Sequence, residues 1–294
     1  ILNFAAESHV DRSIDGPGNF LRSNTVGVFE LLESVRRYLP DLPPGHREDF
    51  RFLQVSTDEV FGSLGPEGAF TEATPYAPRS PYSATKAAAD HLTRAYHETY
   101  GLPTLITNCS NNFGPYQYPE KLIPLMTLNA RAGRDLPVYG KGNNVRDWLH
   151  VEDHCSAISA VLERGRPGST YNVGARNELT NLQVVHAVCT AMEGILPAGE
   201  HPELKRRGIS GYPELVTFVQ DRPGHDFRYA IDPSRIEEEL GWQAAIPFQE
   251  GLEETVAWYV RHEDWCREVQ DGVYDGERLG LSTRSPENQS EVEP

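Results

Sequence analysis

Cysteine and long apolar runs are scarce in this sequence. It has four cysteines in 294 residues, at Cys109, Cys155, Cys189 and Cys266, and no Cys-x-x-Cys pair. This spacing argues against a zinc knuckle or a dithiol redox motif, and we expect free thiols in a reducing cytoplasm. Because no apolar run approaches the length of a membrane-spanning helix, we also expect no membrane segment.

Positively charged residues are also scarce in comparison with negatively charged ones. The chain carries 27 Lys and Arg against 43 Asp and Glu, a formal net charge of -16. Such an excess of negative charge repels nucleic-acid phosphates, so general binding to nucleic acid is not expected. The net charge is still compatible with one nucleotide ligand held in a local basic pocket.

Strand-like and helix-like segments alternate in the first part of the chain. Apolar strands are expected at 1–4, 50–55 and 102–108, with helices at 19–38 and 81–100. The alternation predicts an α/β fold with a Rossmann-like, doubly wound parallel sheet. We expect the apolar side of the first helix to include Val26, Phe29, Leu31, Leu32 and Val35.

The rhythm changes after Pro115, which predicts a second, smaller domain of mixed α/β structure. Further helices are expected near 121–132, 151–162, 181–192, 233–240 and 248–261, with a strand at 170–173. We assign 1–115 to the sheet domain, with returns near 144–165 and 214–230, and 116–280 mainly to the smaller domain. A ligand is expected in the cleft between them. Residues 281–294 are rich in Glu, Pro and Ser and predict a disordered tail.

Tyr82 and Lys86 are four residues apart at the start of an expected helix and therefore share a face. An ammonium beside a phenol favours the phenolate, which predicts a lowered pKa for Tyr82 and a base usable near neutral pH. On spacing alone, a pair of surface residues is the other interpretation.

A hydroxyl and two adjacent carboxylates, Thr57, Asp58 and Glu59, follow the strand expected at 50–55. Neighbouring carboxylates can act as acid and base when their environments separate their pKa values. A solvated turn or a helix cap is the alternative interpretation of Asp58 and Glu59.

These stretches lie within a longer set of motifs. The sequence resembles the extended short-chain dehydrogenase/reductase family and, within it, the sugar-nucleotide 4,6-dehydratases. The resemblance runs from Ile1 to about Gly280, and its matching segments are 3–13, 56–62, 80–86, 107–116, 119–124, 146–153 and 221–226. Thr57-Asp58-Glu59 is the feature that separates dehydratases from epimerases in this family.

The resemblance implies an NAD-dependent hydro-lyase that converts dTDP-glucose to dTDP-4-keto-6-deoxyglucose for deoxysugar biosynthesis. Tyr82, helped by Lys86, would take the proton of the carbon 4 hydroxyl while hydride passes to NAD. Glu59 would remove the hydrogen on carbon 5, Asp58 would protonate the departing hydroxyl on carbon 6, and hydride would return to carbon 6. Thr57 would hydrogen-bond the carbon 4 oxygen. Several alternatives are open: another NAD-dependent sugar-nucleotide dehydratase or an epimerase of the same fold, an inactive binding or scaffold protein, and an inactive fragment that lacks the glycine-rich loop.

The resemblance also implies two binding sets. The cofactor set is Ala5, Ala6, Ser8, Asn24, Ser56, Tyr82, Lys86, Cys109 and Asn112. The substrate set is His9, Asn111, Lys121, Leu122, Tyr139, Arg146, Asn181, Arg222 and His225. Ala5 and Ala6 could instead be small core residues, and His9 could instead be a cap. The family's usual dimer makes the helices at 19–38 and 80–100 candidates for a homodimer interface.

No metal site is expected. His150 and His154 are four apart, but the glutamate between them is not adjacent to the first histidine, as a zinc-binding His-Glu-x-x-His requires.

The beginning of the chain departs from the family. Ile1 opens a strand already in progress, with no secretory signal before it, and no glycine-rich phosphate loop leads into the first helix. An acidic residue to hold the adenosine ribose is lacking too. We therefore expect a fragment that lacks on the order of eighty residues, the first three βα units of such a fold, and that binds NAD poorly by itself.

Overall fold

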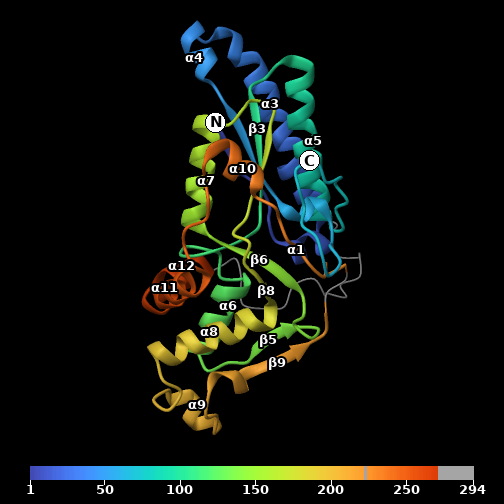
Figure 1. Ribbon diagram of the computed structural model, residues 1–294. Coiled ribbons are helices and arrows are strands. Elements are labelled where there is room, and N and C mark those ends of the chain that lie inside the picture. Colours follow the sequence, from blue (N-terminus) through green and yellow to red (C-terminus); the bar gives the residue numbers. More distant parts are fainter. Residues whose placement is uncertain (222–223, 271–294) are drawn as a thin grey trace.

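The computed structural model describes residues 1–221 and 224–270 and consists of two lobes (Figure 1). A parallel sheet between helices forms one lobe, and the other contains the helices α6 and α8 beside short strands. In the part of the chain that is described, no helix is long and apolar enough to cross a membrane.

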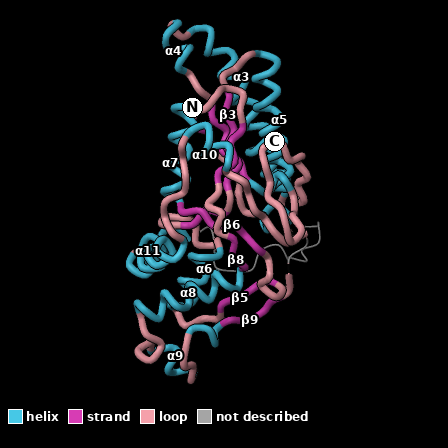
Figure 2. The backbone as a smooth tube through the Cα atoms, viewed as in Figure 1, coloured by secondary structure: helices cyan, strands magenta, loops and turns pink. Residues whose placement is uncertain are grey.

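The large sheet has the order β1-β2-β3-β7, and every pair is parallel. Its strands are β1 (Leu2–Asn3), β2 (Phe52–Thr57), β3 (Thr104–Cys109) and β7 (Thr170–Val173). Most side chains of β2 and β3 are buried, because helices cover both faces of the sheet. Parallel strands end at the same edge, so the segments after β1, β2 and β3 lie next to one another (Figure 2).

Two helical layers enclose this sheet. One face is covered by α3 (Gly27–Tyr38) and α5 (Pro81–Tyr100), and the other by α7 (Val151–Arg164) and α10 (Ser234–Leu240). Helix α5 begins at a Ser80 capping box with Pro81 in its first turn and ends at Gly101, whose φ of 68° is left-handed. The helix expected at 81–100 is therefore confirmed.

The helix expected at 19–38 is present but composite. A π-helical turn, η1 (Leu21–Val26), joins α2 (Pro17–Phe20) to α3. Leu32 and Val35 are buried as predicted, together with Val28. The prediction was wrong for Val26, Phe29 and Leu31, which are 47%, 40% and 38% exposed, because the π-turn changes the face that α3 presents to the sheet.

The second lobe packs three helices around its own apolar core. These are α6 (Leu122–Arg131), α8 (Asn181–Ile195) and α11 (Phe248–Arg261). Its strands form a three-stranded sheet of β4 (Asn111–Phe113), β6 (Val145–His150) and β8 (Glu178–Thr180), and a parallel pair of β5 (Leu136–Tyr139) and β9 (Val216–Val219).

Short elements complete the described chain, and α4 was not expected. They are α1 (Val10–Asp15), η2 (Leu39–Asp41), α4 (Pro44–Asp49), η3 (Asp58–Phe61), α9 (Pro202–Arg207), η4 (Tyr212–Leu215) and α12 (Glu263–Gln270).

Strand pairing corrects part of the predicted domain division. The segment Val216–Val219 was expected to return to the large sheet, but it pairs with β5 in the second lobe. Conversely, β7 pairs with β3 and α10 packs against the large sheet, although both elements fall within 116–280, the range assigned mainly to the smaller domain. Position along the chain does not reveal which sheet edge accepts a short strand. The functional division stays a prediction, and 281–294 lies outside the described residues.

Candidate active site

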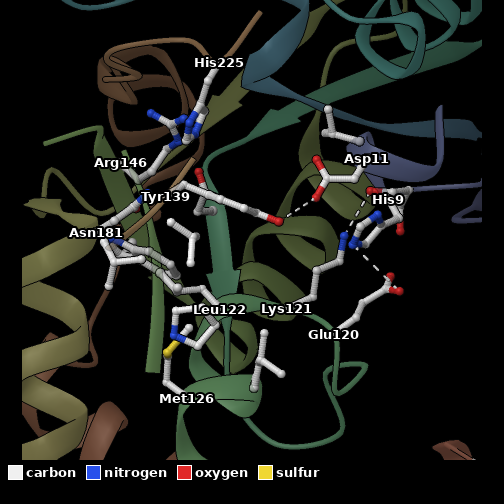
Figure 3. Close-up of a pocket in the computed structure, with 18 of the residues that line it drawn as sticks. His9, Asp11, Glu120, Lys121, Leu122, Met126, Tyr139, Arg146, Asn181 and His225 are labelled. Atoms are coloured by element: carbon white, nitrogen blue, oxygen red, sulfur yellow. Dashed lines mark hydrogen bonds and ion pairs between the residues drawn. The ribbon is translucent and has the colours of Figure 1, made fainter. Parts of the chain in front are cut away.

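A cavity of about 280 Å³ lies between the two lobes. Arg146 and His225 occupy one side of it and face His9, Asp11, Lys121 and Glu120 on the other (Figure 3). Leu122 and Met126 of α6 supply an apolar wall below. A pocket with separate charged and apolar sides suits a ligand that carries both a phosphate group and a ring.

The cavity is lined by every predicted substrate residue that the structure describes: His9, Asn111, Lys121, Leu122, Tyr139, Arg146, Asn181 and His225. Arg222 lies outside the described residues. The sequence interpretation missed several lining residues, including Asp11, Glu120, Met126 and Trp148. Asp11, Glu120 and Trp148 fall inside the matched segments at 3–13, 119–124 and 146–153, so position within those motifs was the available signal.

Contacts between the lobes hold the mouth of the cavity together. The Tyr139 hydroxyl donates to Asp11 Oδ2 at 3.2 Å, and Lys121 Nζ donates to Ser8 O at 3.0 Å. Arg12 also binds Glu120 at 2.8 Å. His9 Nδ1 accepts from the Arg12 amide at 3.2 Å, so His9 caps α1 and lines the cavity at once.

Arg146 is buried and fixed in position. It donates to the carbonyl of Asp226 at 3.0 Å and to that of Val145 at 2.7 Å. Its guanidinium carbon lies 4.1 Å from the centre of the Tyr229 ring, and Tyr229 in turn donates to Asp226 Oδ2 at 2.6 Å. A guanidinium held this way is a preorganised cation at the cavity wall.

The end of β2 separates the two neighbouring carboxyl groups. Thr57 caps the 3-10 turn η3, and its Oγ1 accepts from the Glu59 amide at 3.3 Å. The turn buries Asp58 at 2% exposure, whereas Glu59 reaches the cavity wall. A solvated turn is therefore excluded for Asp58.

Burial favours the protonated form of Asp58. Desolvation raises the pKa of this carboxyl well above its usual value, and the charge of Glu59 adds to the rise. Asp58 Oδ1 contacts Thr57 Oγ1 at 3.3 Å, and Oδ2 has no hydrogen-bond partner among the described residues. The structure thus places a carboxyl group whose protonated form is favoured beside one that faces the cavity, which is the pair an elimination requires.

The environment of Tyr82 differs from the prediction. Burial raises the pKa of its phenol well above the usual value, and the charge of Glu59 adds to the rise. The expected lowering by Lys86 was wrong for this structure, because Lys86 Nζ donates to Val55 O at 2.7 Å and burial lowers its own pKa. Thr57 hydrogen-bonds the Tyr82 phenol, so both face the end of β2.

The predicted cofactor residues lie along the shared carboxyl edge of the sheet. Ala5 and Ser8, after β1, are exposed and Ala6 is half-buried, which rules out small core residues at positions 5 and 6. Ser56 is the residue before the last one of β2, Cys109 ends β3, and the Cys109 thiol donates to Ser56 O at 3.3 Å.

Asn24 has a supporting position. It is 1% exposed, accepts from the Glu7 amide at 2.8 Å, and donates to Glu7 O at 2.9 Å and Thr85 Oγ1 at 3.0 Å. These bonds tie the segment after β1 to α5, and the contact of Asn24 with a cofactor stays a prediction.

The described residues fit the nicotinamide end of NAD. Buried Asn112 Oδ1 has no partner among them, which suits an amide donor at this edge. The described residues do not fit the adenosine end of NAD in the same way. The spacing Gly-x-x-Gly-x-x-Gly does occur, at Gly62, Gly65 and Gly68, but it follows η3 and no helix begins there, so it cannot act as the phosphate loop.

The two histidines that resembled a zinc motif have structural positions. His150 Nδ1 accepts from the Glu152 amide at 3.4 Å and caps α7, and burial lowers the pKa of His154 to about 4. Among the described residues no cluster of three metal-binding side chains occurs.

Comparisons with known proteins agree with this geometry. The family described as GDP-mannose 4,6 dehydratase matches residues 1–255. A dTDP-glucose 4,6-dehydratase of Xanthomonas campestris pv. campestris is 56% identical over 282 residues, spanning 96% of this chain and 78% of that protein.

Two solved structures that align with this chain are also dTDP-glucose 4,6-dehydratases. The dTDP-glucose 4,6-dehydratase of Bacillus anthracis, in complex with NAD, aligns with a TM-score of 0.76 at 47% identity over 92% of this chain and 75% of that one. That of Streptomyces venezuelae, also with NAD bound, aligns with a TM-score of 0.80 at 42% identity over 92% and 75%. The chain therefore belongs to the dTDP-glucose 4,6-dehydratases of the extended short-chain dehydrogenase/reductase family.

Proposed function

We infer that this chain dehydrates dTDP-glucose to dTDP-4-keto-6-deoxyglucose with NAD as cofactor. The observation that carries the proposal is the separation of Asp58 and Glu59, one buried with a raised pKa and the other at the wall of the cavity. The names of the relatives and the NAD found in two related structures support the substrate and cofactor.

The three acid–base groups converge on one sugar ring in this proposal. Tyr82 takes the proton of the carbon 4 hydroxyl, and Thr57, which hydrogen-bonds Tyr82, also hydrogen-bonds the carbon 4 oxygen. A ketone at carbon 4 acidifies the hydrogen on carbon 5, which Glu59 removes. Asp58 donates its proton to the hydroxyl leaving carbon 6, and water is lost.

The cofactor is held along the sheet edge by Ser56, Lys86, Cys109, Asn112 and the segment Ala5–Ser8. NAD, when bound, would supply the hydride acceptor for carbon 4 and the hydride donor for carbon 6, and the positive charge of its oxidised ring would favour a phenolate at Tyr82 and offset the burial that raises the pKa of Tyr82. Glu59, which holds the proton taken from carbon 5, returns a proton to that carbon as carbon 6 receives the hydride. The proposed substrate contacts are Arg146, Lys121 and Arg222 to the diphosphate, with Tyr139, Asn181 and His225 beside the nucleoside.

Label transfer tests the reaction. Product formed from dTDP-glucose deuterated at carbon 4 should carry the label at carbon 6 of a 4-keto sugar. Retention of the label in a 4-epimer, or its release in free NADH, would contradict the dehydratase proposal. An epimerase has no elimination for Asp58 and Glu59 to serve, so the same experiment separates the two.

A homodimer through α3 and α5 is part of the proposal. Their outer sides, with the adjoining η1, expose apolar residues, among them Val26 of η1 at 47%, Phe29 of α3 at 40% and Tyr100 of α5 at 52%. An apolar strip of this kind supports an interface between copies of the chain. Sedimentation should give twice the chain mass, and Phe29→Asp should lower it to the monomer, while Glu30→Gln on the same helix should not.

We also propose a cytoplasmic location. All four cysteines are free thiols, which suits a reducing compartment. Recovery of the protein with the membrane or periplasmic fraction of its host would contradict this.

A further inference from the structure

A buried carboxylate that the proposed mechanism does not use lies one turn beyond Lys86 on α5. Asp90 is fully buried, and its Oδ2 accepts from Ser56 Oγ at 2.7 Å, Tyr76 Oη at 3.0 Å and Asn108 Nδ2 at 3.3 Å. Three donors from two strands and a loop on one oxygen stabilise the ionised form.

The other oxygen of Asp90 is buried without a hydrogen-bond partner among the described residues. Tyr82, Lys86 and Asp90 repeat at four-residue spacing, so the three side chains lie along one buried face of α5. The nearest ammonium on this face is that of Lys86, which is 5% exposed.

A buried lysine without a counter-ion loses its proton readily, and pKa values of about 5 to 6 are known for such groups. Burial lowers the pKa of Lys86, and the negative charge of Asp90 opposes that effect. In turn, burial raises the pKa of Asp90, and Lys86, the hydrogen-bond donors and Arg94 reduce this rise. The two groups therefore stabilise each other in their charged forms.

We propose that Asp90 is a positioning residue that acts through Lys86, as the buried counter-ion that keeps its ammonium charged beside Tyr82 during oxidation at carbon 4. Its contacts also fix Ser56 and Asn108, at the ends of β2 and β3, relative to α5. This inference rests on the proposed function for its catalytic consequence, but the charge of Lys86 can be measured without turnover.

The remaining charged or titratable groups around this pair are few. Arg94 NH2 donates to Tyr76 Oη at 2.7 Å, and His91 packs against the Tyr76 ring at 5.3 Å between ring centres. On the β3 side lies Cys109, and burial raises the pKa of its thiol to about 12, so it stays neutral. Asp90 is thus the negative charge that compensates Lys86.

Lysine NMR provides a direct test, because the chain has only four lysines, at positions 86, 121, 141 and 205. In protein labelled with 13C at lysine Cε, the Lys86 signal is identified by its loss in Lys86→Arg. Asp90→Asn keeps an oxygen for the three donors and removes only the charge. We expect it to lower the pKa of Lys86 by about one unit or more.

Tyr76→Phe is the matched control, since it removes one donor to Asp90 but keeps the charge, and it should leave the Lys86 titration nearly unchanged. An unchanged Lys86 pKa in folded Asp90→Asn would overturn the proposal. If that variant fails to fold, the unaltered protein decides: a Lys86 signal that is neutral at pH 7 overturns the proposal, and a charged one supports it.

Turnover gives the second readout. In Asp90→Asn the alkaline limb of the kcat/KM profile should move to lower pH by about one unit, and the isotope effect with carbon 4 deuterated substrate should increase. A wild-type chain that makes no 4-keto product would contradict the proposed function, whereas the NMR titration would still decide the role of Asp90. A uniform loss of kcat with an unmoved profile would indicate a purely structural role.

Discussion

The strand ends around Tyr82 and the cavity between the lobes place their polar groups in different surroundings. At the strand ends, Asp58, Tyr82 and Lys86 are almost completely buried, and burial moves their pKa values away from the usual range. In the cavity, the Lys121 ammonium remains partly open to solvent, and Lys121 and Glu120 bridge the two lobes. The difference indicates that the first region sets protonation states and the second sets affinity.

Glu59→Gln should have the largest effect, because Glu59 belongs to both regions. Loss of the base should slow water elimination by about 10²- to 10⁴-fold. Oxidation at carbon 4 does not need Glu59, so single-turnover absorbance at 340 nm should still show NADH forming. Equal loss of both steps would assign Glu59 to binding instead, and Glu72→Gln, at a carboxyl outside the cavity, is the control.

Asp58→Asn should abolish activity but change the pH dependence of stability. The folded pKa of Asp58 is raised, so above about pH 4 the unfolded chain releases a proton that the folded chain retains. The free energy of unfolding contributed by Asp58 therefore falls as pH rises, by about 1.4 kcal/mol per unit, until the folded pKa is reached.

Since asparagine cannot ionise, the stability of Asp58→Asn relative to wild type should increase between pH 4 and 7. Urea unfolding at several pH values measures this. A difference independent of pH would mean that Asp58 is ionised in the folded protein.

Arg146→Lys should affect binding more than chemistry. Lysine cannot reproduce the planar donor set over Tyr229, and loss of a charge-assisted hydrogen bond costs about 1.5–3 kcal/mol. KM for dTDP-glucose should therefore rise roughly tenfold to a hundredfold with a smaller change in kcat. A fall in kcat alone would mean that Arg146 acts mainly on Asp58, whose pKa it lowers.

Tyr139→Phe should have the smallest effect. It removes a single hydrogen bond of 3.2 Å to Asp11 between the lobes, worth about 0.5–1.5 kcal/mol. We expect KM to rise about two- to tenfold and kcat to be unchanged. A large loss of kcat would show that the contact between Tyr139 and Asp11 controls the chemical step, and not only the acid and base groups at the strand ends.

Motifs that are continuous in sequence were predictable. Ser80 and Pro81 begin α5 and Gly101 ends it, as local capping chemistry requires. All the substrate residues except Tyr139 and Asn181 likewise lie in the matched segments, and the cavity is lined by every member of the set that the structure describes.

Properties that depend on surroundings were not predictable. Spacing placed Lys86 near Tyr82 but could not show that burial outweighs its charge and raises the pKa of the phenol. Nor could it show that a π-turn exposes Phe29, or that β9 pairs with β5.

The sequence by itself determined which acid and base groups the chain possesses and the strands and helices that carry them, because capping and periodicity act over a few residues. Only the tertiary structure decided that Asp58 is buried while Glu59 opens into a cavity, and that Asp90 lies behind Lys86. Desolvation and charge coupling depend on what is packed around a group, and those neighbours come from distant parts of the chain.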